Sequence, residues 1–197
     1  FTVDHGLRRG AAAEARMVAD TAHRYGLCHK TLKWQGPKPE NGIEEAAREA
    51  RYRLLIEAAE EAGISDILTA HHREDQMETV LMRLGKGSGL AGLVGMRPER
   101  QLSEKVTLHR PLLALSKAQL VSTVASAGLT PVEDEFNIDQ RFARPRLRRL
   151  MPDFAAAGIG ADGVAQAAQR LARADEAIEH FVDEILRAAV SVDRFAV

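Results

Sequence analysis

The sequence of 197 residues contains one cysteine, Cys28, and almost no net charge. A single cysteine excludes an intrachain disulfide, a Cys-only zinc site and a cysteine-ligated iron–sulfur cluster, and it predicts a cytoplasmic protein. Lys+Arg 27 against Asp+Glu 28 gives a net charge of -1, which excludes a histone-like polycation. No run approaches the roughly 20 apolar residues of a membrane span, and there is no signal-peptide pattern, so we expect no membrane partner.

The remaining composition, 45% hydrophobic and 28% charged, is typical of a globular domain. The chain opens on Phe1-Thr2-Val3-Asp4-His5, a segment typical of a buried strand, with no initiator Met before it. We therefore expect the natural protein to begin upstream of Phe1.

Strand-like and helical segments alternate along the chain. Helical patterns at 11–25, 41–62, 71–84 and 116–127 lie between or after strand-like runs at 1–5, 27–34, 64–70 and 106–113. This order predicts an α/β fold, with a Rossmann-like parallel sheet covered by helices on both faces. Residues 1–152 would form this core, and the Ala-rich residues 153–197 a C-terminal helical extension.

Two helices carry recognisable start signals. Asn41 is the expected N-cap of the 41–62 helix, with Glu44 three residues on, and Ser116 is the expected N-cap of the 116–127 helix. The expected buried face of the first of these helices consists of Ile43, Ala46, Ala47, Ala50, Leu54, Ala58 and Ala62.

The segment from His71 to Thr79 is rich in acids and directly follows a predicted strand. Ligands of parallel α/β sheets bind outside the carboxyl ends of the strands. Helical spacing places His71, Asp75 and Glu78 on one face and an apolar stripe of Met77, Val80, Leu81 and Leu84 on another. Two carboxylates and a histidine would hold Mg²⁺, a substrate ammonium or a proton in transit, whereas the same pattern also fits a solvated helix start.

Five of the 15 glycines lie between Gly85 and Gly95. Such a loop would let backbone N–H groups approach a phosphate, or it would be a flexible connector. It is not a Walker A motif, because Val80 stands at the first glycine position and Gly87 follows the lysine.

A dense basic cluster of arginines follows the acidic run 133–135 and supplies the local patch that a neutral chain would need for phosphates: Arg141, Arg144, Arg146, Arg148 and Arg149. A solvated helix face is the alternative interpretation.

Several segments, in this order, resemble the tRNA(Ile)-lysidine synthetases over about residues 1–152. They are Val3-Asp4-His5-Gly6-Leu7-Arg8, Ala47-Arg48-Glu49-Ala50-Arg51-Tyr52, the block from His71 to Thr79, Gly87-Ser88-Gly89-Leu90-Ala91-Gly92-Leu93, Arg110-Pro111-Leu112-Leu113 and the stretch 134–152. The resemblance implies an ATP pyrophosphatase (PP-loop) fold of the adenine nucleotide alpha hydrolase type. It further implies a carbon–nitrogen ligase that uses ATP and Mg²⁺.

In that reaction, ATP adenylates the C2 oxygen of the wobble cytidine in the CAU anticodon of tRNA(Ile) and releases pyrophosphate, and the amine of L-lysine then displaces AMP. By the resemblance, Asp75 and Glu78 bind the lysine ammonium or accept its proton, Arg48 holds the lysine carboxylate, and His71 assists proton movement or phosphate binding. Nucleotide-binding candidates are Asp4, His5, Gly87, Ser88, Gly89, Arg144 and Arg148. No resident metal site is expected, and family members are commonly homodimers.

Three departures from the family pattern matter. The Ser-Gly-Gly-x-Asp-Ser phosphate loop is absent, so we expect the 197 residues alone to be unable to adenylate. Glu74 stands where Asp is common, which would shift Mg²⁺ geometry, and Pro145 replaces a frequent Asn within the arginine cluster.

Other functions remain open at this point. The related tRNA thiolases generally use paired cysteines, and amide-forming relatives such as GMP or asparagine synthetases lack the 71–92 pattern. A non-catalytic nucleotide- or RNA-binding module is another alternative. A metal hydrolase built on His71, His72, Asp75 and Glu78 is the last.

Overall fold

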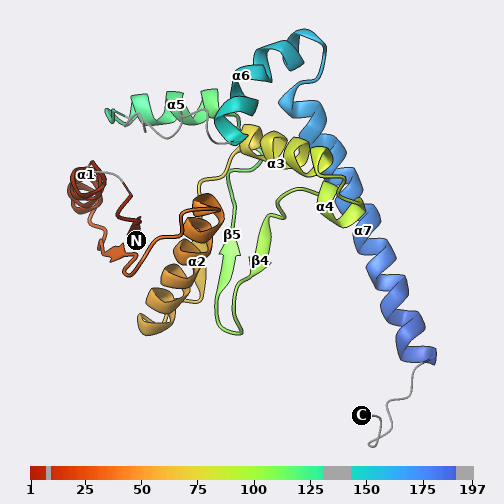
Figure 1. The fold of residues 1–197 in the computed structure, drawn as a ribbon, viewed down its shortest axis with the longest axis horizontal. Coiled ribbons are helices and arrows are strands. Elements are labelled where there is room, and N and C mark those ends of the chain that lie inside the picture. Colours follow the sequence, from red (N-terminus) through yellow and green to blue (C-terminus); the bar gives the residue numbers. More distant parts are fainter. Residues whose placement is uncertain (8–9, 131–142, 190–197) are drawn as a thin grey trace, which may run out of the picture. The chain divides into compact units, whose positions relative to one another are not determined.

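The structure, a computed structural model, describes residues 1–7, 10–130 and 143–189 (Figure 1). The described chain forms two compact units. The first comprises residues 1–69 and 99–109, and the second comprises residues 70–98 and the described residues from 110 onward. The predicted domain boundary after residue 152 lies inside a helix, α6 (Ala143–Ala156), and stays a prediction.

The first unit contains two helices and five short strands. In chain order they are β1 (Thr2–Asp4), α1 (Ala11–Arg24), β2 (Thr31–Lys33), α2 (Ile43–Glu61), β3 (Asp66–Leu68), β4 (Glu99–Gln101) and β5 (Thr107–His109). β1 pairs with β2 in parallel, and β3 pairs with β5 in parallel. The predicted α/β class with parallel pairing is confirmed.

β4 was not predicted from the sequence. It pairs antiparallel with β5, so that the second sheet has the order β3-β5-β4. All three of its residues are exposed, and the segment Glu-Arg-Gln has no apolar alternation. A strand of this kind owes its existence to the backbone hydrogen bonds of its neighbour, which a local pattern does not reveal.

The hydrophobic core of the first unit gathers on α2. Its buried residues come from β2, α2, β3, β5 and the residue just before β5: Leu32, Leu55, Ala58, Ala59, Ile67, Val106 and Leu108. Since α2 contacts β1, β2 and β3, one helix face covers strands from both sheets. This packing holds the carboxyl ends of β1 and β2 in place, where Asp4 and His5 lie.

The start and the face of α2 differ in detail from the prediction. The N-cap is Gly42, at φ 68°, instead of Asn41, and no side chain caps the helix. Leu55 and Ala59 belong to the buried set, whereas Ala62 is exposed. The helix therefore begins after a left-handed turn that glycine adopts without strain, and its face is set by the strands it covers.

The second unit is helical. It contains α3 (Arg73–Gly85), α4 (Leu90–Leu93), α5 (Lys117–Ser126), α6 (Ala143–Ala156) and α7 (Ala161–Ala189). α7 packs along α3 and α4, and α6 contacts α3 (Figure 1). The predicted C-terminal helical region is thus confirmed within the described residues. Ser116 is the N-cap of α5, as predicted: its hydroxyl accepts from the backbone N–H of Gln119 at 3.3 Å.

Arginine–carboxylate pairs fasten α7 to the rest of its unit. Arg97 donates to Asp175 at 2.6 Å and to Glu176 at 3.0 Å, and the Arg73 guanidinium pairs with Asp162. Asp175 is only 6% exposed, so its pairing with Arg97 satisfies a buried charge. No helix among the described residues is long and apolar enough to cross a membrane.

Candidate functional site

The acidic segment predicted to carry chemistry forms the first turns of α3. Its N-cap, His72, is extended, and the backbone N–H of His72 donates to Oδ2 of Asp75 at 3.0 Å. Oδ1 of Asp75 lies 3.5 Å from the guanidinium of Arg148. Asp75 therefore uses one oxygen to start the helix and presents the other to a cation.

Glu78 lies one turn further along α3 and is almost completely buried, at 2% exposure. Arg148 on α6 approaches it with two nitrogens: Nε is 2.5 Å from Oε1 and an Nη is 3.3 Å from Oε2. Burial alone would lower the pKa of Arg148, but the hydrogen bond to Glu78 and the negative charges of Glu78 and Asp75 raise it above its ordinary value. The pair is a two-pronged, charge-assisted contact in a partly dehydrated site.

This geometry corrects the prediction that the acids of α3 form an open face beside a separate apolar stripe. Glu78 is buried, whereas Leu84, predicted to pack, is 57% exposed. Helical periodicity placed Asp75 and Glu78 on one face, and that face turned out to lie against α6. His71, also assigned to this group, is half-buried in the same unit just before the N-cap.

Glu74, whose side chain is longer than the Asp common in the family, makes contacts that link two helices. Its Oε2 accepts from the backbone N–H of Lys117 at 2.9 Å and lies 2.9 Å from Nδ1 of His72. The extra methylene thus lets one carboxylate join the starts of α3 and α5. Sequence reasoning missed this contact, because it joins residues 43 positions apart.

The glycine-rich segment 85–95 is anchored more firmly than a flexible connector. Gln76 donates to the carbonyl of Met96 at 3.0 Å and accepts from the Met96 N–H at 2.7 Å. Arg83 donates to the carbonyls of Gly92 and Gly95, each at 2.8 Å. Neither Gln76 nor Arg83 was a sequence candidate, although both lie on helix positions that face this segment.

The backbone donors of this loop are partly engaged. The N–H of Gly87 donates to Leu84 at 2.9 Å, and the N–H of Ser88 donates to Arg83 at 3.0 Å, which together end α3. A phosphate contact here would therefore need other donors of the segment, such as the Ser88 hydroxyl or the N–H of Gly89. The loop also contains the short helix α4, which the sequence did not predict.

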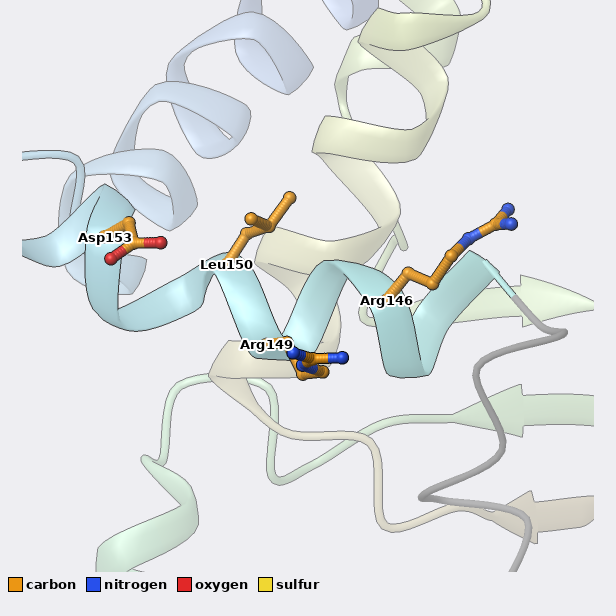
Figure 2. A pocket seen from close by; sticks show the side chains of 4 residues that line it. All are labelled: Arg146, Arg149, Leu150 and Asp153. Carbon is orange, nitrogen blue, oxygen red and sulfur yellow. The ribbon is translucent and has the colours of Figure 1, made fainter.

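The structure divides the predicted arginine cluster. Arg148 turns toward the carboxylates of α3, and Arg144 is half-buried. Arg146 and Arg149 are exposed and line a shallow depression of about 330 Å³ with Leu150 and Asp153 (Figure 2). Arg141 lies outside the described residues. The described part of the cluster is therefore two sets of side chains with different surroundings, and among them Arg148 alone contacts the acids of α3.

The first unit holds the other candidates, Asp4, His5 and Arg48. Oδ1 of Asp4 accepts from the N–H of Gly6 at 2.9 Å, which closes a tight turn directly after β1. The guanidinium of Arg48 lies 5.1 Å from the centre of the Tyr52 ring on the same helix, a cation–π contact one turn apart.

His5 has distinctive surroundings. Its ring meets Trp34 edge-on at 5.9 Å, its Nε2 lies 3.4 Å from Arg51, and its Nδ1 is buried without a hydrogen-bond partner. Burial lowers the pKa of His5, and the Arg51 charge lowers it further, against an opposing effect of Asp4. The imidazole is thus held neutral at the carboxyl end of β1.

Trp34 and Lys38 are neighbours of His5 that sequence reasoning missed. Nζ of Lys38 lies 3.7 Å from the centre of the Trp34 ring and donates to the Trp34 carbonyl at 2.6 Å. The only signal in the sequence was a tryptophan at the end of the predicted strand 27–34. The group is aromatic and cationic, a combination suited to a base or a phosphate.

No group of three or more His, Cys, Asp or Glu side chains suited to a metal ion occurs among the described residues. Asp75 and Glu78 are already neutralised by Arg148, and Glu74 is engaged by Lys117. The described acids of α3 therefore do not fit a resident metal centre, and the metal-hydrolase interpretation gains no support from them.

Comparison with known proteins decides the family. A family model described as a PP-loop domain matches residues 1–154. The chain belongs to the PP-loop domain family. Membership confirms the resemblance drawn from the ordered motifs and implies the use of ATP.

Curated relatives of this PP-loop domain are tRNA(Ile)-lysidine synthases. The protein from Bradyrhizobium sp. strain BTAi1 is 54% identical over 182 residues, which are 92% of this chain and 51% of that protein. The protein from Rhodopseudomonas palustris is 52% identical, over 98% of this chain and 55% of its own length. The chain thus spans about half the length of the curated relatives it matches.

A solved structure supports the fold of this PP-loop domain. The U34-tRNA thiolase NcsA from Methanococcus maripaludis, with its [4Fe-4S] cluster, superposes with a TM-score of 0.67 over 86% of this chain and 60% of that chain. At 14% sequence identity, the likeness concerns the fold alone.

Proposed function

We propose that the protein containing this chain is a tRNA(Ile)-lysidine synthetase. It would ligate lysine to C2 of the wobble cytidine in the CAU anticodon of tRNA(Ile), at the expense of ATP. Identities of 52–54% to lysidine synthases over most of the chain support the proposal. The observation that carries it is the Asp75–Glu78 pair, which holds an organic cation, the guanidinium of Arg148.

The reaction would proceed in two steps. The C2 oxygen of cytidine attacks the α-phosphorus of ATP, and pyrophosphate leaves. The ε-amine of lysine then attacks C2, and the former C2 oxygen departs within AMP. Lysine enters as an ammonium, so it must lose a proton before its nitrogen can attack.

The acids of α3 suit the second step. A buried carboxylate such as Glu78 binds an ammonium strongly and can take its proton once the amine is poised for attack. Asp75, whose second oxygen accepts from the His72 N–H, would orient the ammonium. We assign His71 to proton movement or phosphate contact and Arg48 to the lysine carboxylate.

The nucleotide would lie against the remaining candidates. Asp4 is the last residue of β1 and His5 follows it, at the carboxyl end where ligands of parallel sheets bind, and a neutral His5 can share a hydrogen bond without adding charge. We assign Gly87, Ser88 and Gly89 to nucleotide or tRNA, and Arg144 and Arg148 to phosphates.

The finer parts of the proposal rest on the resemblance. L-lysine is the amine donor, Mg²⁺ accompanies ATP, the protein is a homodimer, and it is cytoplasmic. Thiolase chemistry is not proposed for this chain, since its sequence offers only Cys28, which is exposed.

The test uses the complete gene product with ATP, Mg²⁺, labelled lysine and tRNA(Ile) bearing a CAU anticodon. We expect lysine incorporation by the wild type and a loss of at least 100-fold in Asp75→Asn and Glu78→Gln, on the scale of lost acid–base catalysis. Glu57→Gln, which changes an exposed acid on α2, is the matched control and should retain activity. Absence of incorporation by the wild type would refute the function, and full activity of both variants would refute the residue assignment.

A further inference from the structure

The Arg148 contact closes on the atoms that the proposed function assigns to the lysine ammonium. Both oxygens of Glu78 face the guanidinium, at 2.5 Å and 3.3 Å, and Oδ1 of Asp75 lies 3.5 Å from it. Oδ2 of Asp75 accepts from the His72 N–H. Each of the four carboxylate oxygens is thus already engaged, and a substrate cation cannot reach the pair while Arg148 stays in place.

The burial of the three side chains is unequal. The side chain of Glu78 is 3% exposed and that of Asp75 is 14% exposed, whereas that of Arg148 is 34% exposed. The acids are therefore fixed in the interior, and the cation is the partner that reaches them from the water side. A long, flexible side chain in that position can leave without opening a void beneath it.

While Glu78 is ionised it needs a cation beside it, because an unpaired charge in a buried site is costly. An ammonium that replaces a guanidinium keeps the acid neutralised throughout the exchange. The energetic cost of removing Arg148 is therefore offset by the ligand that takes its place, which makes the two cations direct competitors.

We propose that Arg148 is a built-in competitor of the substrate amine: it occupies the Asp75–Glu78 subsite and is displaced as lysine binds. The proposal rests on the proposed function, since that function assigns this subsite to lysine. It makes Arg148 a determinant of lysine affinity. A purely structural ion pair predicts the opposite response, because loss of Arg148 would then loosen the subsite and weaken binding.

The experiment is a calorimetric titration of the complete gene product with L-lysine, in the absence of ATP and tRNA. We expect Arg148→Gln to bind lysine at least tenfold more tightly than the wild type. Arg149→Gln, which removes the exposed neighbouring arginine, should stay within twofold of the wild type. Unchanged or weaker lysine binding by Arg148→Gln, or no binding by either protein, would overturn the proposal.

A second measurement covers the case in which Arg148→Gln does not fold. Arg148→Ala leaves room for free ethylguanidinium, which should weaken lysine binding to this variant at least fivefold and leave Arg149→Ala unaffected. Arg148→Lys, which retains the charge but not the two-pronged contact, should bind lysine with intermediate affinity. If ethylguanidinium has no effect and Arg148→Lys binds like the wild type, the competitor role is wrong.

The lysidine assay separates the two proposals. If the wild type attaches no lysine to tRNA(Ile), the proposed function fails. If it does so while the Arg148 variants bind lysine no more tightly, only the competitor role fails.

Discussion

Arg148 and Glu78 lie 70 positions apart in the sequence, and their side chains meet through two nitrogen–oxygen contacts at 2.5 Å and 3.3 Å. One partner comes from the arginine-rich helix α6 and the other from the acidic helix α3. The contact joins two segments that the sequence presents as separate features, a phosphate-binding patch and an acid pair. The positive charge of Arg148, from the arginine-rich patch, thus lies directly beside the carboxylates of the acid pair.

We expect the Arg148–Glu78 pair to contribute measurably to stability. Removal of one partner of a buried pair costs about 3–5 kcal/mol, and the partial exposure of Arg148 reduces this to about 1–3 kcal/mol. A double-mutant cycle of Glu78→Gln and Arg148→Gln, followed by urea unfolding, should give a coupling energy of at least about 1 kcal/mol.

The exposed pair Lys30–Glu61 is the control for this cycle. Its side chains are 59% and 70% exposed, so a coupling below about 0.5 kcal/mol is expected. Equal coupling energies in the two cycles would show that burial does not strengthen the Arg148–Glu78 pair.

Gly95→Ala should destabilise the loop that follows α4. Gly95 has φ 70°, and an added Cβ would lie 2.7–2.8 Å from the side chain of Gln76. Backbone strain and this clash together should lower the free energy of unfolding by about 2–4 kcal/mol. Gly128→Ala is the control: at φ 66° with nothing within 4 Å, it should cost only about 1 kcal/mol. Similar losses in the two variants would show that Gln76 yields to the methyl group.

The titration of His5 should reflect its burial and its contact with Arg51. Because both lower the pKa of His5 in the folded protein, the unfolded chain binds more protons, and stability should fall as pH decreases below 6.5 toward the folded-state pKa. An NMR titration should place the His5 midpoint below 6.5, and Arg51→Gln should raise it. Arg53→Gln, an exposed arginine on the same helix, should leave it unchanged. If Arg51→Gln leaves the midpoint unchanged, the charge of Arg51 does not lower the pKa of His5.

Glu74→Asp should loosen the start of α5. The shorter side chain cannot reach both the Lys117 N–H and His72, so one hydrogen bond worth about 0.5–1.5 kcal/mol is lost. Amide hydrogen exchange should show faster exchange in the first turn of α5 and unchanged exchange in α7. Equal protection of α5 in the variant and the wild type would show that Ser116 and Gln119 cap the helix without help from Glu74.

Much of the local structure followed from short-range signals. Gly26, Gly63 and Gly128 directly follow the helical segments predicted at 11–25, 41–62 and 116–127, and their φ values of 69°, 66° and 66° are ones that glycine adopts with little strain after a helix. Ser116 caps α5 through its own hydroxyl, a contact within one helical turn. The alternation of strands and helices likewise predicted the α/β class, because the spacing of apolar residues along the chain differs between a strand and a helix.

Long-range packing decided the rest. Partners 43 to 70 positions away determine three features of the site. They are the burial of Glu78, the division of the arginine cluster and the hydrogen bond between Glu74 and the start of α5. The antiparallel strand β4 depends on hydrogen bonds to β5.

The sequence by itself determined the family, the fold class and the identity of the acids and arginines, because residue type, spacing and order are local properties of the chain. Only the tertiary structure decided which arginine meets which acid and how deeply Glu78 is buried. The spacing of charged residues along a helix predicts which side chains share a face. Their ion-pair partners depend on which other helix packs against that face.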